Sequence, residues 1–143
     1  MGIESSANAA EPAIFVLTKD QLDYAVNALI DEFLSCERGH LLKKAFLYGS
    51  YARGDFEEYS DVDLLFLADS RNPRELYECI RPLELRLTDE FGVEINAFFV
   101  DIDEFYQTMP VTSLYKNVVR EGVTYYASED MPHKDEKDIL YRL

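Results

Sequence analysis

The chain has 143 residues, which suits one domain, and 48% of them are apolar, enough to build a buried core. Fourteen Lys and Arg residues stand against 28 Asp and Glu residues, so the formal net charge is −14. Because neutralisation of phosphate groups supplies most of the affinity for nucleic acids, this charge argues against a protein that binds DNA or RNA directly. The apolar runs are far shorter than the roughly 20 residues that span a bilayer, so we expect no membrane segment.

The chain carries no signal for secretion and no pattern of structural cysteines. Its first dozen residues lack the basic start and the apolar stretch of a signal peptide. Cys36 and Cys79 are far apart and belong to no metal-binding motif. We therefore expect a cytoplasmic protein with reduced thiols. We expect residues 1–12 to form a flexible tail, 13–127 the domain, and 128–143 a charged tail.

The first predicted helix begins after Thr18. Thr18 and Gln21 have the spacing of a capping box, in which the two side chains satisfy backbone N–H groups of the first turn. The apolar residues that follow recur at steps of three and four, which indicates one buried helix face. They are Leu22, Ala25, Val26, Leu29, Ile30 and Phe33. We expect Gly39 to end this helix in the left-handed conformation.

The rest of the chain alternates between predicted strands and helices, which is typical of an α/β domain. Strands are expected over 45–48, 61–68, 93–100 and 123–126, the last one at a sheet edge. The strand over 61–68 has apolar residues on both faces, which places it inside a covered sheet. One helix is expected over 72–91, with Pro73 in its first turn and Gly92 after its end. Shorter helices are expected over 101–109 and 112–121.

Two carboxylates, Asp61 and Asp63, open the second predicted strand. Residues two apart on a strand project from the same face, and at ~6 Å with an effective dielectric near 20 these charges would repel by about 3 kcal/mol. No Lys or Arg lies within five residues of the pair, and Arg53 is the nearest. A hard divalent cation such as Mg²⁺ is the natural partner of such a pair. The alternative is a Ser-Asp turn in which Asp63 is simply solvated.

Gly49 and Ser50 follow the first predicted strand directly. A glycine there lets the backbone approach a ligand closely, and exposed N–H groups with the Ser hydroxyl suit phosphate oxygens. Arg53 could add its charge to the same phosphates. The alternatives are a plain turn at Gly49-Ser50 and a surface ion pair of Arg53 with Asp55 or Glu57.

The order G-S, ten residues, then D-x-D resembles the signature of the DNA polymerase β-like nucleotidyltransferases. The stretch from Gly49 to Gly54, followed by 60–64, is similar to the minimal nucleotidyltransferase (MNT) branch in particular. Val93-Glu94-Ile95 and Arg120-Glu121-Gly122 occupy the places of that branch's later acid and its R-E-G stretch. The resemblance covers about residues 18–126 and implies a small mixed β-sheet flanked by helices.

The resemblance also implies roles for the site residues. Asp61, Asp63 and Glu94 would be the catalytic carboxylates and would hold two Mg²⁺ ions that bridge the phosphates of ATP. Gly49 and Ser50 would bind the triphosphate. The third acid of the family is often Asp, and Glu94 could instead be an ordinary strand acid. A second D-x-D at 101–103 is better explained by capping of the following helix than by metal binding.

MNT proteins of this size are similar to the antitoxins of HEPN/MNT toxin–antitoxin pairs. The resemblance implies Mg²⁺-dependent transfer of AMP from ATP to a tyrosine of a HEPN toxin, and the charge of −14 fits docking onto a basic partner. One alternative is transfer to a small hydroxylated compound, such as an aminoglycoside, by a homo-oligomer. Another is a non-catalytic module that neutralises its partner by contact alone.

Overall fold

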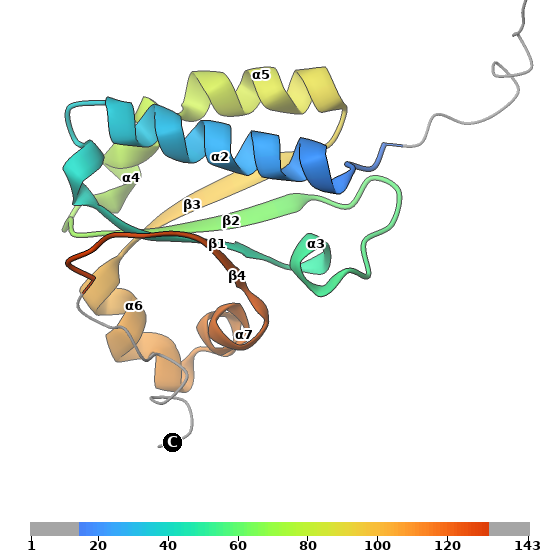
Figure 1. The fold of residues 1–143 in the computed structure, drawn as a ribbon. Helices are drawn as coiled ribbons and strands as arrows, with labels where there is room; N and C mark the ends of the chain where they lie inside the picture. Colours follow the sequence, from blue (N-terminus) through green and yellow to red (C-terminus); the bar gives the residue numbers. More distant parts are fainter. Residues whose placement is uncertain (1–14, 132–143) are drawn as a thin grey trace, which may run out of the picture.

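The computed structural model describes residues 15–131, which form a layered α/β domain around one four-stranded sheet (Figure 1). The strand order is β3-β2-β1-β4; β2 and β3 are parallel, whereas β1 is antiparallel to both of its neighbours. The strands are β1 (Leu42–Tyr48), β2 (Val62–Ala68), β3 (Ile95–Asp101) and β4 (Val123–Ala127). The predicted α/β class and mixed sheet are confirmed. The predicted tail 1–12 lies outside the described residues, as does most of the tail 128–143.

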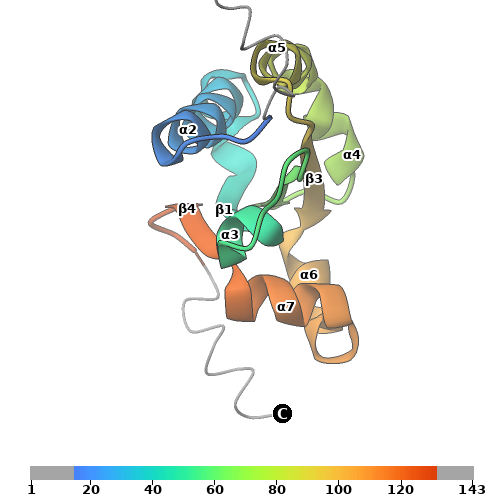
Figure 2. The ribbon, with the colours of Figure 1, turned by 90° about the vertical axis from the view of Figure 1, so that its right-hand side faces the viewer.

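Helices cover both faces of the sheet, as the end-on view of Figure 2 shows. One face is covered by α2 (Lys19–Ser35) and α5 (Arg81–Phe91), and the other by α6 (Ile102–Thr108) and α7 (Ser113–Glu121). The shorter elements are α3 (Ser50–Arg53), α4 (Pro73–Leu76), η1 (Gly39–Leu41), η2 (Tyr77–Cys79) and η3 (Met109–Val111). No described helix has the length and apolar character needed to cross a membrane.

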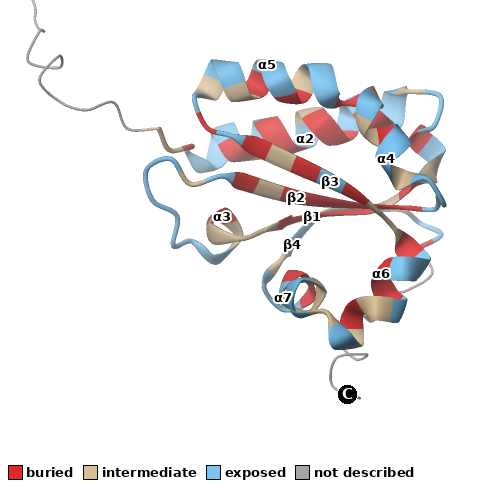
Figure 3. Cartoon of the chain, turned by 180° about the vertical axis from the view of Figure 1, so that it is seen from behind, coloured by how far each residue is buried: buried red, intermediate tan, exposed pale blue. Residues whose placement is uncertain are grey.

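The two helix layers create two hydrophobic cores that share the central strand β2. Leu64 and Phe66 pack in the core beneath α2 and α5, whereas Leu65 and Leu67 pack in the core beneath α6 and α7. Since successive strand residues point to opposite faces, a strand covered on both sides needs an unbroken apolar run. Figure 3 shows this burial along β1 and β2, with exposed residues concentrated on the outer helix faces. The predicted interior place of this strand is confirmed.

The start of α2 is confirmed, but its predicted end is wrong. The Thr18 side chain accepts from the Gln21 backbone N–H, and the Gln21 side chain accepts from the Thr18 N–H. The helix ends at Ser35, and Gly39 instead begins η1 without a positive φ. A Cβ at Gly39 would lie 2.3 Å from the Leu34 carbonyl oxygen, so this glycine permits close backbone approach rather than a helix cap.

The helix predicted over 72–91 is divided into α4, η2 and α5. Pro82 explains the division. In a continuous helix it would lack the N–H that bonds to the carbonyl of Glu78, and its ring would crowd that carbonyl. At the second position of α5 the missing N–H has no consequence, because the first-turn donors have no partner within a helix. The predicted end is confirmed, since Gly92 caps α5 with φ 69°.

We expect Thr18→Ala to lower the free energy of unfolding by about 1 kcal/mol, because it removes the acceptor for the Gln21 N–H at the start of α2. Urea denaturation measures the change. Thr18→Ser retains the hydroxyl and should stay close to wild type. Equal losses in both variants would mean that packing of the Thr18 methyl group, rather than the cap, stabilises this end.

Candidate active site

The predicted site residues meet at one end of the sheet. Because β1 and β2 are antiparallel, the end of β1 lies beside the start of β2, and parallel pairing brings the start of β3 alongside. Asp63 is paired with Tyr48 on one side and with Asn96 on the other. The Val62 N–H donates to the carbonyl of Glu94 at 2.9 Å, which places Glu94 beside the start of β2. The topology thus brings together segments that are far apart in the sequence.

The three acids lie on the same face of the sheet. Asp63 has the parity of Leu65, so it points toward the α6 and α7 side, and Asp61 shares that face. Glu94 precedes Asn96, the partner of Asp63, by two residues and has the same parity. Within residues 15–131, no three His, Cys, Asp or Glu side chains are grouped closely enough to hold a metal ion. The acids are therefore aligned on one face without forming a closed cage.

Asn96, on the neighbouring strand β3, lies beside the two aspartates. Its Nδ2 atom donates to Asp61 Oδ2 at 3.3 Å, and Asn96 is the partner of Asp63 across the parallel pair β2–β3. Its residue type alone indicates no role in the site. The signal for it was the two-residue step from Glu94, which puts both side chains on the face of the predicted carboxylates.

Asp63 carries a charge in an unfavourable environment. Burial raises the pKa of its carboxyl above the usual value of 3.8, and the neighbouring charge of Asp61 raises it further. The Asn96 hydrogen bond and the charge of Arg53 lower this pKa, while Glu94 raises it. Close carboxylate oxygens that disfavour one another are hard donors of the kind that Mg²⁺ prefers. The Asp61–Asp63 pair therefore offers hard oxygen ligands of the kind that suits a divalent cation.

Gly49 is required by its contact with Asp63. Its φ of 78° disfavours residues with a side chain, and a Cβ would lie 2.5 Å from Asp63 Oδ2. Ser50 follows it as the first residue of α3. The backbone of the predicted phosphate-binding dipeptide thus lies directly against the predicted metal-binding carboxylate.

Tyr51 anchors this loop to the body of the domain. Its ring is buried and stacks on Phe56 with centroids 4.4 Å apart. Its hydroxyl accepts a hydrogen bond from the Leu17 N–H at 3.1 Å. The contact joins α3 to the segment that precedes α2, so the Gly49-Ser50 turn is held from a second direction.

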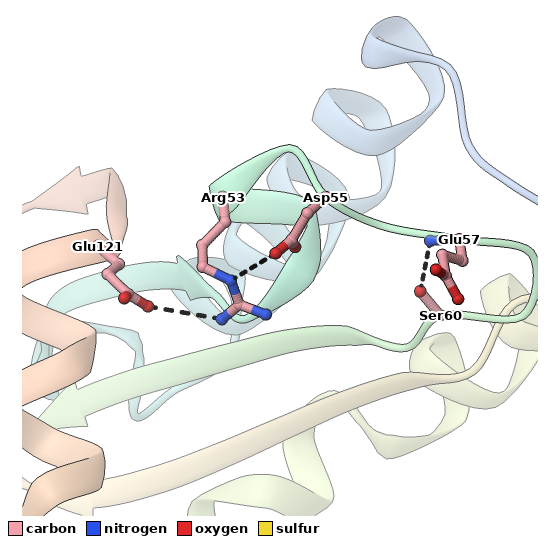
Figure 4. A network of polar contacts seen from close by, with 5 residues as sticks. All are labelled: Arg53, Asp55, Glu57, Ser60 and Glu121. Carbon is pink, nitrogen blue, oxygen red and sulfur yellow. Dashed lines mark hydrogen bonds and ion pairs between the residues drawn. The ribbon is translucent and has the colours of Figure 1, made fainter.

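Arg53 forms ion pairs rather than standing alone (Figure 4). Its Nε lies 3.2 Å from Asp55 Oδ2, and its Nη1 lies 3.5 Å from Glu121 Oε1. The predicted alternative of a pair with Asp55 is confirmed. Glu57 is not the partner, and its backbone N–H donates to Ser60 Oγ. The pair with Glu121 links the R-E-G stretch to the glycine-serine loop.

The second D-x-D lies at the start of α6, away from the carboxylates described above. Asp101 occupies the N-cap position as predicted, but its side chain makes no capping hydrogen bond. The position of this motif in the fold is thus confirmed, whereas the capping interaction is not formed.

Comparisons with known proteins identify relatives of this chain. A family model described as a nucleotidyltransferase domain matches residues 28–126. A protein of Methanocaldococcus jannaschii named "Putative protein adenylyltransferase MJ0604" is 34% identical over 102 residues, which cover 71% of this chain and 95% of that protein. A second protein of that organism, "Putative protein adenylyltransferase MJ1305", is 37% identical over 81 residues, covering 53% of this chain and 55% of its own length.

Solved structures share the fold at low sequence identity. A crystal structure of a toxin–antitoxin with AMP-PNP has a TM-score of 0.53 and 18% identity, covering 84% of this chain and 86% of that one. A mutant of the toxin–antitoxin MntA-HpeT has a TM-score of 0.54 and 17% identity, with the same coverage. At these identities the likeness establishes the fold alone.

We expect Gly49→Ala to lower the free energy of unfolding by about 1–3 kcal/mol, because it adds both a disfavoured φ and a clash with the Asp63 carboxylate. Gly54→Ala is the matched control, since Gly54 also has a positive φ but a Cβ there would have no neighbour within 4 Å. Urea denaturation compares the two. Similar losses would show that the contact with Asp63 contributes nothing.

We expect metal-free Asp63→Asn to be more stable than wild type at pH 7, with a higher Tm, because the variant has no charge to accommodate at this half-buried position. Because the Asp63 pKa is raised in the folded state, the wild-type protein loses stability as pH rises from 3.8 through that raised value. The advantage of the variant should therefore shrink when the pH falls to the ordinary aspartate range. Thermal melts in EDTA across this range test the trend, with Glu58→Gln on the exposed loop as the control.

Proposed function

Because the chain belongs to the nucleotidyltransferase domain family, and is a nucleotidyltransferase, we propose that it transfers AMP from ATP to a hydroxyl group of a partner protein. The observation that carries the proposal is the alignment of Asp61, Asp63 and Glu94 on one sheet face, beside the glycine-serine turn. The two relatives from M. jannaschii bear the name of protein adenylyltransferases, which supports a protein acceptor.

We assign Asp61, Asp63 and Glu94 as the residues that would hold two Mg²⁺ ions. Bound there, Mg²⁺ would neutralise phosphate charge and favour ionisation of the acceptor hydroxyl. The chain's contribution is to hold Asp61 and Asp63 close together despite their repulsion. Glu94, the longest of the three side chains, lies nearest the exposed edge of the sheet and would assist loss of the acceptor proton.

The phosphates of ATP would lie along the Gly49-Ser50 turn. Gly49 lets the backbone approach without a side chain, and the Ser50 hydroxyl is a donor for phosphate oxygen. Arg53 would add positive charge on the same side, since its charge already acts on Asp63. Its ion pairs with Asp55 and Glu121 hold the guanidinium over α3 and define where that charge lies.

We propose that the acceptor is a tyrosine of a HEPN toxin, and that the chain acts in the cytoplasm as the antitoxin. The resemblance to MNT antitoxins and the shared fold with a toxin–antitoxin that contains AMP-PNP support this assignment. The net charge of −14 also favours a basic partner, because opposite charge increases the rate of encounter.

Transfer of labelled AMP tests the proposal. The protein is incubated with α-labelled ATP, Mg²⁺ and the purified HEPN protein of the neighbouring gene. We expect label on a toxin tyrosine, and Asp61→Ala should reduce the rate at least about 100-fold, because loss of a metal-binding carboxylate removes several kcal/mol of transition-state stabilisation. Asp31→Ala, an exposed aspartate on α2, is the control and should leave the rate unchanged.

The same assay separates the alternatives. Label on an aminoglycoside or another small hydroxylated compound, with none on the toxin, would favour the small-molecule enzyme. Tight binding and inhibition of the toxin without ATP, with no label transferred by any variant, would favour the non-catalytic module. Either result would refute the proposed reaction.

A further inference from the structure

We propose that Asn96 is a positioning residue of this site, whose side-chain amide holds Asp61 and Asp63 in one orientation for a divalent cation. The inference rests on the proposed function, since it concerns the same carboxylates. It adds a neutral residue to the site that the D-x-D signature does not contain.

The register of the sheet places Asn96 where one amide can reach both acids. Asn96 is the direct partner of Asp63 across the parallel pair β2–β3, and its Nδ2 lies 3.3 Å from Asp61 Oδ2. A carboxamide carries two N–H donors on one nitrogen, and the Asn96 amide also lowers the pKa of the Asp63 carboxyl, its neighbour across the strand pair. A single side chain thus bonds one carboxylate and lies beside the other, although the two carboxylates repel each other.

The backbone that carries Asn96 is fixed on both sides by α5. The Ile95 N–H donates to Thr88 Oγ1 at 3.2 Å, and the Ala97 N–H donates to Glu84 Oε2 at 2.9 Å. Glu84 is only 4% exposed and also accepts a hydrogen bond from the Tyr77 hydroxyl. The amide therefore projects from a strand that cannot shift without breaking contacts with α5.

An amide suits this position better than a charged or an apolar side chain. A Lys or Arg would neutralise the carboxylates and compete directly with a metal ion for them. An apolar residue would leave both carboxylates free to rotate apart under their repulsion. A neutral donor limits that rotation while the carboxylates keep their negative charge. Partners of this kind typically change metal affinity by about 10–100-fold when they are removed.

The test is a Mg²⁺ titration of the full chain in the presence of AMP-PNP, followed by calorimetry. We expect Asn96→Ala to weaken the apparent Mg²⁺ affinity about 10-fold. With the acceptor present, the Mg²⁺ concentration for half-maximal rate should rise by the same factor, while kcat at saturating Mg²⁺ stays close to wild type. This combination, a higher Mg²⁺ requirement with an unchanged kcat, is not expected when a residue with a purely structural role is removed.

Asn96→Asp provides a second variant of nearly the same shape. It replaces the donor by a third negative charge, so the metal-free Tm should fall by several degrees. Asn72→Asp is the matched control, because it adds the same charge at an exposed position beyond the opposite end of β2. Its Tm should stay within about 1 °C of wild type.

The outcomes distinguish this inference from the proposed function. Wild-type Mg²⁺ affinity in Asn96→Ala overturns the positioning role, as does a metal-free Tm for Asn96→Asp equal to that of Asn72→Asp. If wild type binds Mg²⁺ and AMP-PNP but labels no acceptor, the proposed reaction fails, while the effect of Asn96→Ala on Mg²⁺ affinity still decides the role of Asn96.

Discussion

Repulsion between Asp61 and Asp63 is the constraint on which the rest of the site depends. Two carboxylates on one strand face, one of them half-buried, stabilise nothing by themselves. Burial and the charge of Asp61 both raise the pKa of Asp63, which measures how poorly the fold accommodates its charge. Proteins tolerate such local costs where function requires them and where the surrounding structure is stable enough. Here the stability comes from two cores on opposite sides of β2, whose apolar run begins directly after Asp63.

The scaffold converts this unfavourable pair into a defined geometry through contacts of very different kinds. Gly49 gives Asp63 room on the β1 side, and on the β3 side Asn96 lies opposite Asp63 and donates to Asp61. Arg53 acts from α3 at longer range and is held by Glu121 at the end of α7. Each contact comes from a different element, so the site is a property of the sheet topology rather than of the D-x-D segment alone.

Local rules predicted the features whose causes are local. The capping box at Thr18 and the glycine cap at Gly92 depend on a few neighbouring residues, and both are formed. The apolar run of β2 identified a doubly covered strand for the same reason. The single helix over 72–91 was wrong because its apolar periodicity concealed the effect of Pro82. Gly39 was misassigned because the helix ends earlier, at Ser35, and the glycine serves a close approach to the Leu34 backbone without a positive φ.

The site was predictable in its charged residues and not in their partners. The spacing of Gly49-Ser50 and Asp61-Asp63 implied the carboxylate face and the turn beside it. The ion pair between Arg53 and Glu121 joins residues 68 positions apart, and no periodicity predicts such a contact. The two-residue step from Glu94 put Asn96 on the face of the carboxylates, but its place opposite Asp63 depends on the register between β2 and β3.

The bonds from α5 to β3 also determine how this protein can associate with others. β3 is an edge strand, and an open edge offers unpaired N–H groups to any strand that approaches. Thr88 and Glu84 already occupy the outward N–H groups of Ile95 and Ala97. The half of this edge nearest the carboxylates is thereby closed to strand addition. A strand of another protein therefore cannot pair there and bury the acidic surface.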